Sequence, residues 1–175
     1  MRSLGRILLF TGDGKGKTTA ALGMVLRACG HGQKTLIIQF IKSDDSTGEI
    51  AGLKHLPRVE ILQKGLGFIP PEKEQSFEKH REAAQAGLKT AAEALASGKY
   101  DLVILDEICL AIARHLLEED QVVEVVQQAS PGTCIVMTGR GARAGLIALA
   151  DTVTEMHLVK HGLASGIKAQ KGVEY

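Results

Sequence analysis

RILLFTGDGKGKTT, residues 6–19, joins a short apolar run to three glycines and the triplet Gly16-Lys17-Thr18. The apolar run predicts a buried strand that stops at Gly12, and the residues from Lys17 onward predict a helix. In such a strand-to-helix loop, glycine N–H groups can surround phosphate oxygens, and the helix N-terminus adds partial positive charge. The stretch therefore predicts a phosphate loop that binds ATP with magnesium.

Several residues of this loop have an expected part in holding the triphosphate. Lys17 is expected to reach the outer phosphates, and the Thr18 hydroxyl is expected to bind Mg²⁺, with Mn²⁺ as an alternative. The loop is a variant, because Thr11 stands where the usual pattern has its first glycine. The bland alternative is an ordinary glycine-rich turn. The residues assigned to ATP in the loop are Gly12, Asp13, Gly14, Lys15, Gly16, Lys17, Thr18 and Thr19.

Polar side chains follow three other predicted strands. Asp106 and Glu107 end the run LVILDE (102–107), and a strand beside a phosphate loop would bring one of them to magnesium or its water. The alternative is a strand that ends in solvated acids. Lys42 and Arg140 follow two further strands and are also assigned to ATP, because the carboxyl ends of parallel strands share one edge of a sheet. Arg140 in a glycine-flanked turn suits a polyphosphate, although a solvated loop Arg is the alternative.

Apolar runs and helical periodicities alternate along the chain, which predicts a parallel sheet covered by helices on both faces. Strands are expected at 6–11, 34–41, 59–62, 101–105, 133–138 and 152–159. Helices are expected at 17–29, 72–97, 108–117, 121–129 and 144–150. Loops are expected at 42–57, where a helical turn can fit, and at 160–175. The prediction is a three-layer α/β fold of the P-loop NTPase type with a mainly parallel central sheet. Residues 1–175 are expected to form one domain.

The composition excludes several classes of protein. Lys and Arg total 21 against 20 Asp and Glu, a formal charge of +1, so we expect neither nucleic acid nor a membrane surface as partner. No apolar stretch approaches the roughly 20 residues that span a bilayer, and the apolar start continues into the glycine loop. We therefore expect a cytoplasmic protein. Cys29, Cys109 and Cys134 lack metal-type spacing and are expected to be reduced core thiols.

A longer series of segments matches one family. The segments are 10–21 (FTGDGKGKTTAA), 30–32 (GHG), 39–42 (QFIK), 65–68 (GLGF), 105–107 (LDE), 138–141 (TGRG), 150–155 (ADTVTE), 160–161 (KH) and 166–170 (GIKAQ). In this order the chain resembles the corrinoid adenosyltransferases of the phosphate-loop type over residues 6–175. The resemblance implies an alkyl transferase that moves the 5′-deoxyadenosyl group of ATP to Co(I) of a corrinoid and releases triphosphate. The corrinoid would be cobalamin, cobinamide or cobyrinic acid a,c-diamide, in synthesis or salvage of adenosylcobalamin.

The resemblance also implies roles for single residues. Lys17, Glu107 and Arg140 would be catalytic, with Thr18 and the Asp106–Glu107 pair holding magnesium. The remaining implied positions are Lys15 against the triphosphate, and Phe68 with Ile69 at the lower face of the corrin. A homodimer and a separate electron-donor reductase are further implications.

The chain departs from the family pattern at three places. Asp13 stands where the usual loop has Asn, which adds a charge near the phosphates. Pro70 replaces a Trp, and only residues 1–5 precede the first strand, where many members carry a helix over the corrinoid. The last two departures concern the corrinoid side of the site.

Two other functions fit a phosphate loop. In an ATPase or phosphotransferase, Glu107 would orient water or an acceptor, and ADP would be a product. In an ATP-dependent binding or delivery protein, the loop would switch conformation with little turnover. The fate of ATP separates the three hypotheses: triphosphate, ADP or almost no product.

Overall fold

A computed structural model describes residues 5–173 of the chain. Within this range six strands form one sheet in the order β3-β2-β4-β5-β1-β6, and every pairing between neighbours is parallel. The strands are β1 (Ile7–Thr11), β2 (Thr35–Gln39), β3 (Val59–Gln63), β4 (Leu102–Asp106), β5 (Cys134–Thr138) and β6 (Thr152–Glu155). The predicted α/β fold is confirmed, and the described sheet is parallel throughout.

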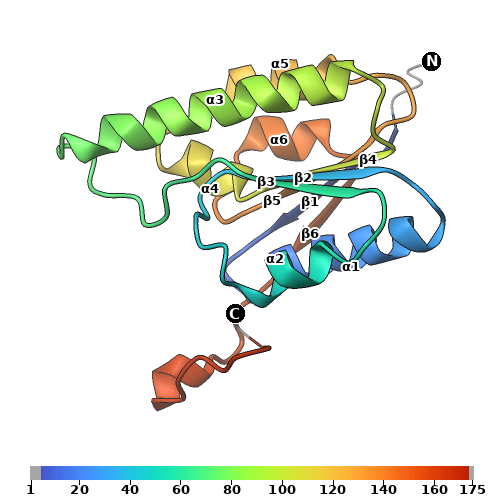
Figure 1. The fold of residues 1–175 in the computed structure, drawn as a ribbon. Coiled ribbons are helices and arrows are strands. Elements are labelled where there is room, and N and C mark those ends of the chain that lie inside the picture. The colour runs from blue at the N-terminus through green and yellow to red at the C-terminus, as the bar shows by residue number, and fades with distance from the viewer. Residues whose placement is uncertain (1–4, 174–175) are drawn as a thin grey trace.

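Helices cover the sheet on both faces and make the three layers visible in Figure 1. One face carries α1 (Lys17–Gly30) and α2 (Gly48–Leu53). The other face carries α3 (Ser76–Ala96), α4 (Ile108–Ala113), α5 (Glu119–Gln127) and α6 (Ala144–Leu149). The central strands β2 and β4 are buried at every residue, and their sequences are therefore almost continuously apolar rather than alternating.

The strand β4 shows how one apolar run serves two cores. Val103 and Leu105 belong to the cluster that includes buried residues of α3, whereas Leu102 and Ile104 belong to the cluster that includes residues of α1. Successive side chains of a strand point to opposite faces, so this run contributes side chains to the core on each face of the sheet. Each such buried aliphatic side chain contributes about 1.5–3 kcal/mol by leaving water. This packing holds Asp106, the last residue of β4, in a fixed position.

The long helix α3 begins later than the sequence predicts. The expected start was residue 72, but the amides of Glu74 and Phe77 bond to the carbonyls of Pro71 and Glu74, three residues back in each case. Tight turns of this kind occupy the segment after the prolines, and the α-helix starts at Ser76. The apolar positions predicted for the helix are all buried, namely Phe77, Ala84, Leu88, Ala91 and Leu95.

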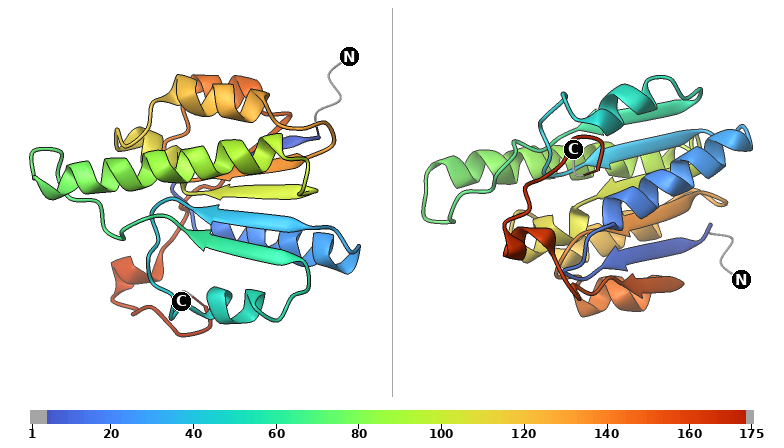
Figure 2. Two further views of the ribbon diagram at one scale, coloured as in Figure 1. Left: turned by 45° about the horizontal axis from the view of Figure 1, so that its top comes forward. Right: turned by 90° about the horizontal axis from the view of Figure 1, so that it is seen from below.

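The region 42–57 agrees with the expected loop that includes a helical turn, whereas the end of the last strand needs correction. The region 42–57 contains the short helix α2, and β6 ends at Glu155 rather than at residue 159. The register pairs Glu155 with Thr11, the last residue of β1, so within residues 5–173 β6 has no partner strand beyond that point. The chain then runs past the carboxyl ends of the strands as a tail, residues 156–173, which includes a 3₁₀ turn at Gly162–Ser165 (Figure 2).

The cysteines differ in burial. Cys109 is buried, as predicted, but Cys29 and Cys134 are only half-buried, and all three are free thiols. Burial raises the pKa of Cys109 to about 12, so this thiol stays protonated and acts as a small apolar group.

Candidate functional site

The phosphate loop follows β1 and rests on the backbone that follows β6. Gly12 and Gly16 have φ angles of 92° and 117°, a region that favours glycine. A Cβ atom on Gly12 or Gly14 would lie 2.4 or 2.7 Å from the carbonyl oxygen of Met156. The amide of Gly14 donates to this oxygen at 2.7 Å. The glycines are therefore required both for the turn and for close contact with Met156.

Lys17 begins α1 and folds its side chain back into the loop. Its Nζ donates to the carbonyl oxygens of Gly12 at 2.6 Å and Gly14 at 2.7 Å, and the residue is only 7% exposed. Burial lowers the pKa of Lys17, and the negative charge of Glu107 partly offsets this effect. An ammonium group held with few partners in a glycine loop is suited to bind an anion there.

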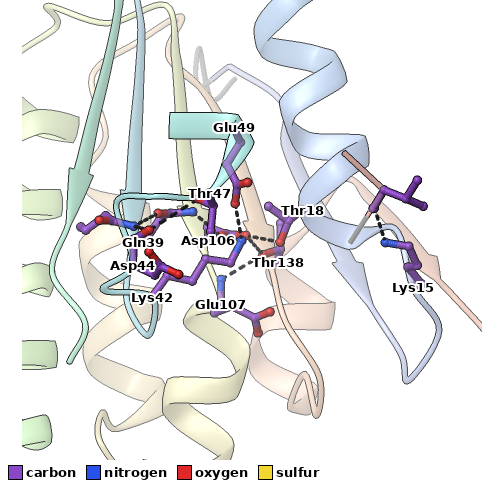
Figure 3. A network of polar contacts seen from close by, with 12 residues as sticks. Lys15, Thr18, Gln39, Lys42, Asp44, Thr47, Glu49, Asp106, Glu107 and Thr138 are labelled. Atoms are coloured by element: carbon purple, nitrogen blue, oxygen red, sulfur yellow. Dashed lines mark hydrogen bonds and ion pairs between the residues drawn. The ribbon is translucent and has the colours of Figure 1, made fainter. Parts of the chain in front are cut away.

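The side chain of Asp106, at the end of β4, contacts residues of α1, β2 and β5 at the carboxyl edge of the sheet (Figure 3). Its Oδ1 accepts hydrogen bonds from the hydroxyls of Thr18 and Thr138, both at 2.8 Å. Its Oδ2 accepts a bond from Gln39 at 3.2 Å and lies 3.4 Å from Nζ of Lys42. At 1% exposure this carboxylate is compensated on both oxygens. The structure thus brings Thr18 and Asp106 together, as the sequence predicts.

Glu107 follows immediately and has a different environment. Its φ of 63° is left-handed, and its amide donates to the Thr138 hydroxyl at 2.9 Å. In the described part of the chain its buried Oε2 has no hydrogen-bond partner. Burial raises the pKa of Glu107, and the neighbouring charge of Asp106 raises it further. An unusual backbone angle and an unpaired carboxylate oxygen together mark a candidate functional residue.

A cavity of about 780 Å³ opens above these groups. Its lining contains the loop residues from Asp13 to Thr19 and the predicted side chains Lys42, Glu107 and Arg140. Gly12 and Asp106 lie outside the lining, where they support Lys17 and Thr18. The other lining residues are Leu22, Gly48, Glu49, Leu110, His161, Gly172 and Val173.

Three parts of this lining were not predicted. Glu49 at the start of α2 holds Nζ of Lys42 at 3.3 Å, and Gly172 with Val173 belong to the tail. His161 had been marked only through its match to the family segment KH. No spacing in a single sequence identifies Glu49, because its contact to Lys42 depends on the path of the loop between β2 and α2.

The tail closes one side of the cavity. Lys15 donates to the carbonyl oxygen of Val173 at 3.0 Å (Figure 3). A second cavity of about 480 Å³ shares Lys15, His161 and Val173 with the first. Its own lining includes the apolar side chains of Val159 and Ile167, which are largely exposed. Apolar surface of the tail therefore adjoins the polar cavity.

Phe68 and Ile69 had been predicted to line the corrin together, and the structure separates them. Phe68 is 90% exposed, so it is not a core anchor of its loop. Ile69 is 6% exposed and packs in the core cluster that includes Phe77 of α3. The predicted contact of Ile69 with a ligand does not fit this arrangement, because its side chain is buried in the core.

The donor set suits a small hard cation. Thr18, Asp106 and Glu107 offer only oxygen atoms, the ligands that magnesium prefers. Residues 5–173 contain no group of three or more His, Cys, Asp or Glu side chains arranged for a metal. Magnesium is commonly held by one or two carboxylates together with substrate phosphates, so a larger group is not required.

Comparison with known proteins identifies the family. The family model described as ATP:corrinoid adenosyltransferase BtuR/CobO/CobP matches residues 3–175. The chain belongs to this family. It is 43% identical to the corrinoid adenosyltransferase of Pseudomonas aeruginosa over 174 residues, which cover 98% of this chain and 84% of that protein. The corrinoid adenosyltransferase of Escherichia coli K12 is 37% identical over 172 residues, covering 98% and 86% respectively.

In this member of the ATP:corrinoid adenosyltransferase family, the polar cavity, the loop and the two carboxylates all lie at the carboxyl edge of the sheet. That edge is where open parallel sheets bind their ligands. None of the helices in residues 5–173 has the length and apolar character that crossing a membrane requires.

Proposed function

We propose that this protein transfers the 5′-deoxyadenosyl group of ATP to Co(I) of a corrinoid and releases intact triphosphate. The observation that carries the proposal is the cavity of about 780 Å³ lined by the phosphate loop, in a chain that matches the family over residues 3–175. The two electrons of Co(I) form the cobalt–carbon bond. The bond between the 5′ carbon and oxygen breaks, and its electron pair stays on the triphosphate.

The protein's main task in this reaction is to stabilise the leaving group. Negative charge gathers on the triphosphate as the carbon–oxygen bond breaks, so fixed cations and N–H donors lower the barrier. Lys17 would exchange the carbonyls of Gly12 and Gly14 for phosphate oxygens, and Lys15 with Arg140 would add charge at the rim. Co(I) is a strong nucleophile by itself, so no general base is needed. Holding the two substrates in line supplies the remaining advantage.

We further propose that Mg²⁺, or Mn²⁺ in its place, would be held beside the phosphate loop. Thr18, Glu107 and Asp106 would hold it, since they offer the oxygen atoms that magnesium prefers. The unpaired Oε2 of Glu107 supports this assignment, because an unpaired buried carboxylate oxygen costs free energy unless a ligand compensates it. When bound, the metal would neutralise charge on the phosphate oxygens.

The corrinoid must lie against the mouth of the ATP cavity, since cobalt has to reach the 5′ carbon. Phe68 is proposed to contact the lower face of the corrin, and its 90% exposure supports this role. Ile69 is no longer part of the proposal, because it packs in the core. We also propose, from the family resemblance, a cytoplasmic homodimer with one domain per chain and a separate reductase that supplies Co(I). Light scattering tests the dimer.

One anaerobic experiment tests the proposed reaction. The protein is mixed with ATP, Mg²⁺ and chemically reduced cobalamin, and the visible spectrum is followed while phosphorus NMR identifies the product. We expect the cobalt–carbon spectrum to appear with one triphosphate per alkylated corrinoid. ADP as the main product would instead support a phosphoryl-transfer enzyme, and almost no consumption of ATP would support a binding or delivery protein.

A further inference from the structure

The cavity for the triphosphate contains almost as many carboxylates as cations. The cationic side chains in its lining are Lys15, Lys17, Lys42 and Arg140, and the carboxylates are Asp13, Glu49 and Glu107. Two of these carboxylates already have a role within the site. Glu49 holds Lys42, and Glu107 lies beside Asp106 at the proposed metal position. The third, Asp13, lies inside the phosphate loop itself, where a negative charge opposes the binding of an anion.

Asp13 faces Arg140 across the mouth of the cavity. The Oδ1 atom of Asp13 lies 4.0 Å from Nε of Arg140, and the two side chains are 79% and 63% exposed. The charges of both residues act on Lys17, since Asp13 raises and Arg140 lowers its pKa, after the larger effects of burial and Glu107. The carboxylate therefore acts on two of the cations that would hold the triphosphate.

We propose that Asp13 competes with the triphosphate for Arg140, so that the product is held less tightly and leaves faster. The inference rests on the proposed function, because it concerns the release of intact triphosphate. Asp13 is a positioning residue in this scheme. It acts through Arg140 and through its field in the loop, and takes no part in bond formation.

The geometry makes the exchange of partners easy. An exposed ion pair at 4.0 Å contributes little to stability, so Arg140 can leave Asp13 at small cost. A guanidinium group can then form two parallel bonds to a phosphate, which are stronger than its contact with Asp13. When the phosphate departs, the carboxylate is already in place to take Arg140 back.

The effect is expected to be larger for the product than for the substrate. Breaking the carbon–oxygen bond leaves an additional ionised oxygen on the triphosphate and removes the nucleoside that helps to hold ATP. A pocket of cations alone would retain such an anion, and product release limits the turnover of many enzymes. A nearby carboxylate therefore weakens product binding most, and substrate binding less.

Asp13→Asn tests the inference, because it removes the charge and keeps the shape. The probe is inorganic triphosphate with Mg²⁺, measured by calorimetry and by inhibition of the adenosyl transfer reaction. We expect triphosphate to bind about three- to tenfold more tightly, as expected for one charge at a partly exposed site. The KM for ATP should fall less, and the gain should shrink as salt is added.

Asp45→Asn is the matched control. Asp45 is exposed and lies outside the cavity lining, so the same change of net charge should leave triphosphate affinity unaltered. Arg140→Gln completes a double-mutant cycle. In that background Asp13→Asn should strengthen triphosphate binding by less, because the residue for which the two anions compete has been removed.

The outcomes separate this inference from the proposed function. Equal or weaker binding of triphosphate to the Asp13→Asn protein, with an unchanged melting temperature, would overturn the competition. An equal gain in the Asp45→Asn control would overturn it too, because the effect would then be one of net charge. If the wild-type protein forms no triphosphate from ATP, the proposed function itself fails, and the inference fails with it.

Discussion

The two ends of the sheet each carry a cluster of charged side chains, and the clusters differ in the direction of their pKa shifts. At the carboxyl end, burial lowers the pKa of Lys17 and raises that of Glu107, so the charged forms are disfavoured. At the amino end, a hydrogen bond from Tyr100 lowers the pKa of Glu60, and a hydrogen bond with Tyr100 raises that of Lys99. There the charged forms are favoured.

The contacts at the amino end explain this difference. The hydroxyl of Tyr100 donates to Glu60 at 2.7 Å, and the other oxygen of Glu60 lies 3.3 Å from Lys99 and 3.5 Å from Lys34. Both ammonium groups lie about 5 Å from the Tyr100 ring centre, at 4.9 and 5.5 Å. Every charge in this cluster has a partner of opposite sign or a ring face.

The cluster at the amino end of the sheet stabilises the fold, whereas the cluster at the carboxyl end is suited to bind a ligand. The amino-end cluster is complete without any other molecule. The carboxyl-end cluster leaves Oε2 of Glu107 unpaired and keeps Lys17 on backbone carbonyls, so its charges are compensated only in part. Sites of this second kind commonly lower stability in exchange for activity.

Loss of Lys17 should give the largest effect. We expect Lys17→Ala, and separately Thr18→Ala, to lower kcat at least about 100- to 1,000-fold, because charge or metal ligation at the leaving group is lost. The fold should survive, as judged by circular dichroism. Lys99→Ala, the control from the amino end, should keep full activity. A folded Lys17→Ala protein with wild-type activity would refute the assignment of the site.

Glu107→Gln should lower the activity and raise the stability of the protein. We expect turnover to fall about 10- to 100-fold from the loss of a metal ligand, while the melting temperature in a chelator rises by a few degrees at neutral pH. The pKa of Glu107 is raised on folding, so the wild-type protein loses stability as the pH rises through that folded pKa.

The advantage of the Gln variant should therefore vanish in acid, where Glu107 is protonated in both the folded and unfolded states. Thermal melts from about pH 3 to pH 8 without metal measure this difference. An advantage that stays constant across the whole range would mean that the titration of Glu107 is not its cause.

Phe68→Ala tests the open side of the site. We expect turnover from Co(II) substrate with a reductant to slow far more than turnover from preformed Co(I), with the KM for ATP nearly unchanged. Because the ring is 90% exposed, the melting temperature should hardly move. Leu66→Ala, in the same exposed loop, is the control. Equal loss with both cobalt states would speak against a role in preparing Co(I).

Tyr100→Phe should have the smallest effect, on stability alone. Loss of its hydrogen bond to Glu60 should cost about 1 kcal/mol at neutral pH and leave activity unchanged. The pKa of Glu60 is lowered on folding, so its contribution is present above the unfolded pKa and is lost as the pH falls through the folded one. Denaturant titrations should therefore give different free energies of unfolding for the two proteins at neutral pH and nearly equal ones at acidic pH.

The sequence predicted the strands well because each is a short apolar run between turn residues. The runs at β1, β4 and β5 lie within about one residue of their predicted bounds. Lys17, Thr18 and Asp106 could be predicted as neighbours because the topology of a parallel sheet brings the ends of its strands together. Burial of the α3 face followed from its helical periodicity.

What could not be predicted depends on contacts between distant segments. Nothing local shows that the tail lines the cavity, since Lys15 and Val173 are 158 positions apart. The opposite environments of Phe68 and Ile69 depend on the course of a loop without periodicity. No local sequence pattern predicts the role of Glu49 either, because its partner Lys42 is positioned by an ion pair with Asp106 on another strand.

The position of β1 has a consequence for the order of events during synthesis. Within residues 5–173, β1 is the first strand to be made, and it lies between β5 and β6, which are made after the other described strands. Gly14 also requires the Met156 carbonyl to complete its turn. Domains generally fold as units, and contacts between distant segments form late. A nascent chain therefore carries its phosphate loop long before that loop can bind ATP, because the turn is complete only after Met156 has been made.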